Sequence, residues 1–436
     1  MSKSIPPGHV DSGDPIEALK QAFHRDDPSL FQNVLARHPE LKSKINQPVD
    51  GCGSPPITLV RGRAMLDALL AAGADINARS QWWAGGFGLL DSARPELAAY
   101  AIERGATVDV HAAARLGMIE KLRELIALNP KLVQARGGDG QTPLHFASNV
   151  EVARLLLDHG ADIDARDVDH ESTPAQYMVR DRQEIARFLV QRGCKTDILM
   201  AAALGDTALV SKHLDADPNC IHVRVTDEYF PKTNHKGGGT IYQWTLGWYV
   251  SPHEVAKASR HEDTFQLLMS RSPDDVRLIV ACWLNDQAEA KSLVKQNPQL
   301  VAALPDTYRR HSARAARNNN VAAVRLMLET GLPVDALGQH RATPLHWAGF
   351  HGNVEMTRDI LQHNPPLELR DADFNATPLG WAIHGSLHGW HRQTGDYGAT
   401  AEALLQAGAK LPEQERECTE AVKTVLQNHA AKIHGG

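Results

Sequence analysis

A cluster of histidines near the C-terminus is the first place in this sequence where the residue types suggest chemistry. His384, His388 and His391 are spaced i, i+4 and i+7, and Asp396 follows them closely. On a continuous helix the three imidazoles would share one face and could bind zinc, with Asp396 as a further ligand. Two interrupting glycines make a turn-rich loop the expected conformation. The pattern therefore favours acid–base chemistry, with Asp396 orienting a histidine, over a zinc site.

Other groups that could transfer protons are spread along the chain. The candidate catalytic residues are His351, His384, His391, Asp396, Tyr242 and Glu254. A hydrolase, lyase or isomerase would suit such a set. No fingerprint of a nucleotide or organic cofactor occurs in the sequence. We therefore expect neither a cofactor nor a metal.

The tryptophans give a second chemical signal. Eight occur, and most lie in or beside irregular segments, in "SQWWAGGFGLLD" (80–91), in "YQWTLGWYV" (242–250) and in "TPLGWAIHGSLHGWHRQTGDY" (377–397). Core packing is the simple interpretation of a large aromatic ring. The regular apolar runs, however, are built from Leu, Ile, Val and Ala. Tryptophan outside those runs favours binding of a sugar ring, another planar or amphipathic small molecule, or a peptide side chain.

The segments that must position these residues repeat along the chain. "TPLHFASNVEVARLLLDHGADIDARD" (142–167) and "TPLHWAGFHGNVEMTRDILQHNPPLELRD" (343–371) share an opening Thr-Pro-Leu-His, a Val-Glu pair and an apolar run. Threonine can cap a helix and proline fits its first turn. Glycines such as Gly160 and Gly193 suit the left-handed position that ends a helix. In these residues the chain resembles the ankyrin-repeat family.

The resemblance implies an all-α solenoid of about twelve helix-turn-helix repeats joined by short hairpin loops. Departures from the repeat mark the expected segment boundaries. We expect an N-terminal tail at 1–14, N-terminal repeats at 15–224, an aromatic and glycine-rich insertion at 225–250, C-terminal repeats at 251–411 with a His/Trp-rich insertion at 385–396, and a capping helix at 412–436.

The resemblance also implies which side chains face a concave groove. The positions seven and eight after the threonine end the inner helix and point into the groove, and repeats without threonine can be aligned on their turn residue. Groove positions and aromatic segments together give the candidate ligand-binding residues Trp82, Trp83, Arg115, Arg180, Asp181, Trp244, His253, Trp283, Arg317, Phe350, Trp381 and Trp390. If the insertions at 225–250 and 385–396 fold inwards, they would turn the groove into a pocket.

Some histidines have a different expected role. The resemblance implies that His145 and His346, in the Thr-Pro-Leu-His phrase, bond the neighbouring turn. His253 occupies an apolar slot directly after the large insertion, and both a core role and a functional role remain open for it.

Composition narrows the classes of partner. The net charge of −6 over 436 residues gives no basic field for nucleic acid. The five scattered cysteines are typical of reduced thiols in the cytoplasm, and no apolar run is long enough to cross a membrane.

Three functions are compatible with these features. We expect a protein that binds a protein partner in its groove. The alternative is a cofactor-independent enzyme acting on a small polar or aromatic molecule such as a sugar derivative, and the third is a small-molecule sensor without turnover. The sequence leaves the oligomeric state open.

Overall fold

The computed structural model describes residues 15–414 and 416–434, which form two compact units. The first unit holds the described residues up to Met200 together with Val225–Gly247, and the second holds Ala201–Arg224 together with the described residues from Trp248 onward. The tail predicted at 1–14 lies outside the described residues.

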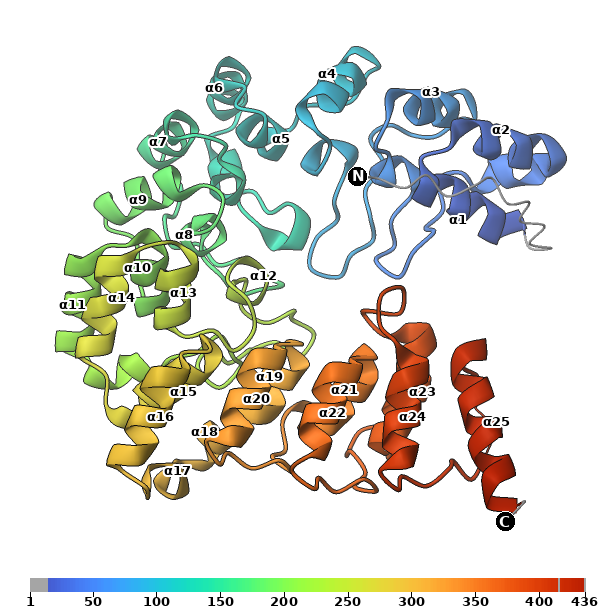
Figure 1. Ribbon diagram of the computed structural model, residues 1–436. Coiled ribbons are helices and arrows are strands. Elements are labelled where there is room, and N and C mark those ends of the chain that lie inside the picture. The colour runs from blue at the N-terminus through green and yellow to red at the C-terminus, as the bar shows by residue number, and fades with distance from the viewer. Residues whose placement is uncertain (1–14, 415, 435–436) are drawn as a thin grey trace. The chain divides into compact units, whose positions relative to one another are not determined.

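Helices make up the regular structure of both units (Figure 1). The helices of the first unit are α1 (Pro15–Arg25), α2 (Pro28–Arg37), α3 (Arg63–Ala71), α4 (Pro95–Glu103), α5 (Val110–Arg115), α6 (Ile119–Leu128), α7 (Val150–Asp158), α8 (Pro174–Met178), α9 (Gln183–Gln191) and α12 (Tyr242–Thr245). Helix α10 (Ile198–Leu204) contains the boundary between the units.

The second unit continues the same pattern of paired helices. Its helices are α11 (Thr207–Ala216), α13 (Pro252–Ala258), α14 (Glu262–Ser270), α15 (Asp274–Trp283), α16 (Gln287–Gln296), α17 (Leu300–Ala303), α18 (Asp306–Arg309), α19 (His311–Arg317), α20 (Val321–Glu329), α21 (Pro344–His351), α22 (Val354–Leu361), α23 (Pro378–His388), α24 (Tyr397–Gln406) and α25 (Glu420–His434).

Short 3₁₀ turns connect many of the helices. They are η1 (Pro39–Lys44), η2 (Pro56–Leu59), η3 (Leu89–Asp91), η4 (Pro130–Gln134), η5 (Gly138–Gly140), η6 (Pro143–Phe146), η7 (Pro218–His222) and η8 (Gln339–Arg341). The described residues contain no β-strand, and a single isolated bridge joins Arg79 to Gly88. The predicted all-α fold is therefore confirmed, while the number of repeats stays a prediction.

The C-terminal helices form two layers. Helices α19, α21 and α23 pack in succession in one layer, and α20, α22 and α24 pack in succession in the other. Small residues allow the close approach within the first layer, since Ala315, Ala316 and Ala348 are completely buried. A Cβ atom on Gly349 would lie only 2.6 Å from the carbonyl oxygen of Pro378. This layer therefore depends on alanine and glycine to bring its helices together.

The Thr-Pro-Leu-His phrase builds the start of an inner helix as predicted. In α21 the imidazole Nδ1 of His346 accepts a hydrogen bond from the backbone N–H of Thr343 at 3.1 Å. Its Nε2 donates to the carbonyl oxygen of Ala376 in the next hairpin, also at 3.1 Å. His145 makes the equivalent bonds to Thr142 and Ser172. The predicted structural role of both histidines is confirmed.

The segment predicted as a loop at 385–396 is partly helical. Helix α23 continues to His388 and ends at Gly389. The reason is that Gly385 packs against the carbonyl oxygen of Phe350 and the ring of Tyr397, where a Cβ would clash. This glycine thus serves close packing of a helix and does not end it. The irregular segment is shorter than expected and begins at Gly389.

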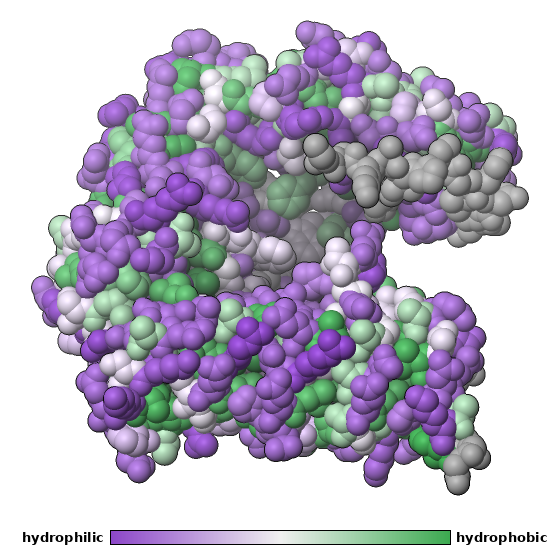
Figure 2. Space-filling view, in the orientation of Figure 1, coloured by the Kyte–Doolittle hydropathy of each residue, from purple (hydrophilic) through white to green (hydrophobic). Residues whose placement is uncertain are grey.

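No helix among the described residues is both long and apolar enough to span a membrane. In the view of Figure 2, hydrophilic residues cover much of the visible face of each unit, with hydrophobic residues between them. The outer helices follow this pattern, since apolar side chains such as Val324 and Ile360 point into the core and Arg325 and Glu355 remain solvated.

Candidate functional site

An aromatic pocket in the second unit is the candidate binding site. It has a volume of about 310 Å³, at the lower end of the range for small-molecule sites. Its residues come from α21, α23, the two hairpins that precede these helices, and the segments after α23. The pocket is lined by His340, Trp347, Phe350, Phe374, Ala376, Gly380, Trp381, His384, Trp390 and Arg416.

Aromatic rings in mutual contact form the walls of the aromatic pocket. The ring centroids of Trp347 and Trp381 lie 4.9 Å apart at 79°, and those of Phe350 and Trp390 lie 5.3 Å apart at 90°. These edge-to-face contacts fix the rings relative to one another. Trp390 and Phe374 remain 57% and 64% exposed, so the pocket has an apolar rim open to solvent.

The two buried tryptophans of the pocket differ in their hydrogen bonding. The indole N–H of Trp381 donates to Oδ2 of Asp371 at 2.9 Å. Burial would raise the pKa of Asp371, but this bond and three backbone N–H bonds outweigh it and hold the pKa below its ordinary value. Trp347 is only 3% exposed, and its Nε1 has no hydrogen-bond partner among the described residues. One buried donor at the pocket therefore lacks an acceptor.

A stacked arginine packs against Trp390 of the pocket wall. The Arg317 guanidinium lies 4.3 Å from the Trp248 ring and 5.2 Å from the Trp390 ring. It donates to the side-chain oxygens of Gln339 and Asn318, both neutral, and burial lowers its pKa. The guanidinium thereby holds the exposed Trp390 ring in place by cation–π attraction.

The predicted proton-transfer residues do not form one group. His384 lines the pocket, and its ring lies 4.7 Å from that of His388; burial and then this second histidine lower the pKa of His384. The ring of His391 instead lies 5.1 Å from that of His351. Asp396 caps α24 by accepting from the N–H of Ala399 and makes no hydrogen bond to a histidine among the described residues.

Other predicted catalytic side chains hold structural bonds. His351 is 2% exposed and donates from Nε2 to the carbonyl oxygen of Arg317, and burial lowers its pKa to about 4. Tyr242 is completely buried in the first unit and donates to Asp197. Glu254 accepts from the backbone N–H of Ser251 and pairs with the buried Arg224 at 3.2 Å.

The predicted binding residues also divide into groups. Phe350, Trp381 and Trp390 meet in the aromatic pocket. In the second unit, His253 bonds Ser272, and Trp283 donates to His311. Arg317, also in the second unit, stacks on Trp248 and Trp390. The other candidates lie in the first unit: Trp82 and Trp83 with ring centroids 6.3 Å apart, Arg115 bound to the carbonyl oxygens of Leu90 and Ala93, the exposed pair Arg180–Asp181, and Trp244, which is 66% exposed.

Sequence reasoning missed Trp347, although the sequence carried a usable signal. The fifth position of each Thr-Pro repeat from 142 onward is aromatic, and the column reads Phe146, Tyr177, Trp347 and Trp381. Adjacent repeats place these positions side by side, so Trp347 was predictable beside Trp381. Arg416 lies outside the regular repeats and had no such signal.

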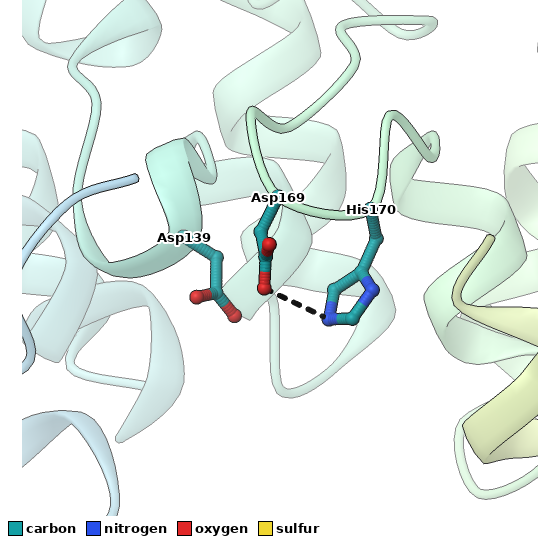
Figure 3. A group of neighbouring side chains, drawn as sticks. All are labelled: Asp139, Asp169 and His170. Carbon is teal, nitrogen blue, oxygen red and sulfur yellow. Dashed lines mark ion pairs between the residues drawn. The ribbon is translucent and has the colours of Figure 1, made fainter. Parts of the chain in front are cut away.

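A second cluster of functional groups lies in the first unit. Asp139, Asp169 and His170 each offer one ligand atom, and these atoms all lie within 4.8 Å of one another. Figure 3 shows the Asp169 carboxylate between the other two side chains. Asp139 stands at the tip of the hairpin at η5 with a left-handed backbone (φ 53°), and Asp169 and His170 stand in the next hairpin. This group is called the Asp–Asp–His cluster below.

Burial and like charge shape the electrostatics of this cluster. Burial, and then the Asp169 carboxylate, raise the pKa of Asp139 to about 6, although the side chain of Trp82 donates a hydrogen bond to it. His170 Nε2 lies 3.6 Å from Oδ2 of Asp169. The cluster was not predicted from the sequence because its residues come from two hairpins about thirty positions apart, a spacing that matches no short metal motif.

Comparison with known proteins identifies the repeated segment. A family profile described as "Ankyrin repeats (3 copies)" matches residues 110–200. The chain is 28% identical over 97 residues to the palmitoyltransferase Hip14 of Drosophila melanogaster, which covers 22% of this chain and 15% of that protein. It is 28% identical over 153 residues to the ankyrin repeat and SAM domain-containing protein 6 of Mus musculus, covering 34% and 16%.

A third similarity is to the E3 ubiquitin-protein ligase XB3 of Oryza sativa subsp. japonica, at 29% identity over 105 residues, covering 24% of this chain and 23% of that one. The matched segments thus span less than a quarter of each of these relatives. The family profile and the name of the mouse protein both identify the ankyrin repeat.

Proposed function

This chain carries ankyrin repeats, and from that premise we propose that it is a protein-binding module whose second unit anchors a partner in the aromatic pocket. Repeat arrays of this kind present extended surfaces to other proteins. The observation that supports the proposal is the aromatic pocket itself, whose walls are buried tryptophans and whose rim is exposed aromatic surface.

The chemistry of the pocket suits an aromatic or large aliphatic anchor side chain. The aromatic walls offer a large apolar contact area, and interface hot spots cluster in such pockets. A partner that covers Trp390 and Phe374 would remove their exposed faces from water. Tyrosine, phenylalanine or a large aliphatic side chain would suit such a pocket.

The charge at the pocket indicates which residue type should lie next to the anchor in the partner. Two acidic groups of the hairpin beside the pocket are already engaged, since Asp371 accepts from Trp381 and Asp373 pairs with His340. Arg416 lines the pocket, is exposed, and makes no ion pair within the described part of the chain. A partner segment that places an aspartate or glutamate near its anchor would pair with this guanidinium.

The geometry does not bring the predicted acid–base residues together. His351, Tyr242 and Glu254 are buried and hold bonds that the fold needs. Asp396 caps a helix and orients no histidine in the described residues. Of the predicted catalytic set only His384 lines the pocket, and no carboxylate within the described residues hydrogen-bonds to it. The pocket does hold one histidine paired with a carboxylate, His340 with Asp373, which was not among the predicted catalytic residues.

Selection of peptides from a displayed random library on the full chain tests the proposal. We expect enriched peptides to share an aromatic or large aliphatic anchor next to an acidic residue. Substituting Trp390→Ala or Phe350→Ala should weaken their binding about 30-fold or more, which corresponds to the loss of about 2 kcal/mol typical of a hot spot.

Trp244→Ala is the matched control, because Trp244 is also an exposed tryptophan but lies in the first unit. Its replacement should leave the affinity unchanged. Enriched peptides that bind the Trp390→Ala and Phe350→Ala variants as tightly as wild type would refute the anchoring role of the pocket.

A further inference from the structure

We propose that the Asp–Asp–His cluster of the first unit binds a divalent transition-metal ion. The proposed metal site is independent of protein binding at the aromatic pocket, since it consists of other residues in the other unit. Asp139, Asp169 and His170 supply two carboxylate oxygens and one imidazole nitrogen, a mixed ligand set used for zinc and for other first-row divalent ions.

The orientation of His170 is the first observation that points to a ligand. Its Nδ1 lies 2.8 Å from the carbonyl oxygen of Gly239. A carbonyl oxygen only accepts, so Nδ1 carries the proton and, in the neutral ring, Nε2 presents a lone pair. Metal-ligating histidines are held in this way, with the second nitrogen donating to a backbone carbonyl. The lone pair lies on the side of the ring that faces Asp169 (Figure 3).

The Oδ2 oxygen of Asp169, which accepts no hydrogen bond within the described residues, is the second observation. This residue is 6% exposed, and its Oδ1 accepts from the backbone N–H of Gly238 at 3.0 Å. Its Oδ2 faces His170 Nε2 at 3.6 Å, which is longer than a hydrogen bond. Two ligands about 2.1 Å from one zinc ion at the tetrahedral angle lie about 3.4 Å apart. The separation of the two atoms thus fits a shared cation better than a direct bond.

The charges of the Asp–Asp–His cluster also favour a bound cation. Two carboxylates from successive hairpins approach each other where they are largely shielded from water, and no lysine or arginine of the described residues pairs with either of them. The third acid nearby, Asp167, is already engaged by Tyr177 and by the backbone N–H groups of His170 and Ser172. A divalent ion would neutralise the repulsion between the two carboxylates, and this relief would strengthen its binding.

An access route and a consequence for the fold also support the site. Asp169 and His170 line a separate cavity of about 310 Å³, through which an ion and its water can enter. The backbone that holds the ligands includes Gly238 and Gly239 of the insertion, so an ion there would tie the insertion to the two hairpins. Its role would be to stabilise the first unit.

Isothermal titration of the full chain with Zn²⁺, after treatment with a chelator, tests the site. The titration is run in a His384→Ala/His388→Ala background, because those neighbouring imidazoles of the second unit could bind zinc by themselves. We expect one equivalent of Zn²⁺ to bind and to raise the melting temperature. Asp139→Asn, Asp169→Asn and His170→Gln should each weaken Zn²⁺ binding by more than about 100-fold. Loss of a residue that only hydrogen-bonds to a metal ligand costs less than this.

Asp181→Asn in the same unit is the control, since Asp181 is exposed and lies outside the cluster. Circular dichroism of the metal-free variants checks that they fold, and Asp139→Asn should fold well because it only removes a like charge. Absence of binding with both Zn²⁺ and Mn²⁺ would overturn the proposal. Binding that survives all three cluster substitutions would do the same, and would leave His170 as the ion-pair partner of Asp169.

Discussion

At the scale of single residues, one hydrogen bond separates two otherwise similar tryptophans. Trp381 and Trp347 occupy the same position in successive repeats, and both are almost fully buried. Trp381 has its acceptor in Asp371, whereas the indole N–H of Trp347 has no partner in the described residues. A buried donor without an acceptor costs about 1–3 kcal/mol. The folded protein therefore carries this cost at the wall of the aromatic pocket.

The raised pKa of Asp139 makes a prediction about pH. In the folded state this pKa is about 6, because of burial and the neighbouring Asp169, and in the unfolded chain it returns to about 3.9. Between these values the folded state binds more protons. The contribution of Asp139 to stability is therefore present below about pH 4 and is lost as pH rises through about 6.

Urea denaturation of the metal-free wild type and of Asp139→Asn measures this effect. The free energy of unfolding of the variant, minus that of wild type, should grow from pH 4 to pH 7, because asparagine removes the penalty of ionisation. A difference that stays constant over this range would show that Asp139 titrates normally.

At the scale of elements, two glycines of α23 have opposite roles. A Cβ on Gly385 would lie 2.6 Å from the carbonyl oxygen of Phe350 and 2.9 Å from the ring of Tyr397. A Cβ on Gly380 meets no atom closer than 3.4 Å. Gly385→Ala should therefore destabilise the second unit by about 1–3 kcal/mol. Gly380→Ala should be neutral or stabilise it by up to about 1 kcal/mol, because alanine is the better helix former.

Thermal and urea unfolding of the two variants compares them directly, and each serves as control for the other. Equal effects of both substitutions would contradict the packing that keeps α23 continuous through Gly385.

Helices α21 and α23 show how far sequence reasoning reaches. The capping threonine and first-turn proline of both helices, and the bonding His346 of α21, were predictable, because each acts through neighbours fixed by the repeat. The continuity of α23 was not predictable, since a glycine in the sequence does not reveal whether it ends a helix or makes room for another. The Asp–Asp–His cluster was also beyond reach, because it depends on how two hairpin tips and the insertion fold together.

The predictions of individual site residues succeeded only in part, for the same reason. Phe350, Trp381, His384 and Trp390 were selected from the repeat position and the aromatic segment, and the structure brings them together. Tyr242, Glu254 and Asp396 were selected for their chemistry alone, and their bonds to Asp197, Arg224 and the N-terminus of α24 follow from contacts that the sequence does not display.

At the scale of the whole molecule, the two units differ in how acid should affect them. Burial lowers the pKa of His253 to about 3 and those of His346 and His351 to about 4, and it holds that of His311 well below its ordinary value. All four lie in the second unit. The first unit contains His145, whose pKa burial lowers to about 3, and three carboxyl groups whose pKa values burial raises, those of Asp91, Asp139 and Asp167.

The sign of the effect is opposite for the two kinds of group. A buried neutral histidine stabilises the fold fully above about pH 6.5, and this contribution is lost as pH falls towards 4, because the unfolded chain takes up the proton first. Each such histidine contributes a slope of about 1.4 kcal/mol per pH unit in this window. In the first unit the carboxyl groups with raised pKa values act in the opposite direction, because they make the folded state more stable as pH falls.

We therefore expect the second unit to lose protection before the first as the pH falls from 7 to 4.5. Hydrogen exchange followed by mass spectrometry, corrected for the intrinsic effect of pH on exchange, resolves the two units. Earlier opening of the first unit would contradict the assignment of the buried histidines as neutral groups.

Anchoring of a protein partner in the aromatic pocket, as proposed above, has a direct test. It is the affinity of a selected peptide for wild type and for Trp390→Ala, with Trp244→Ala as the control. We predict a loss of about 30-fold or more at Trp390 and none at Trp244. Equal affinities for all three proteins would contradict the claim and place the binding surface elsewhere on the chain.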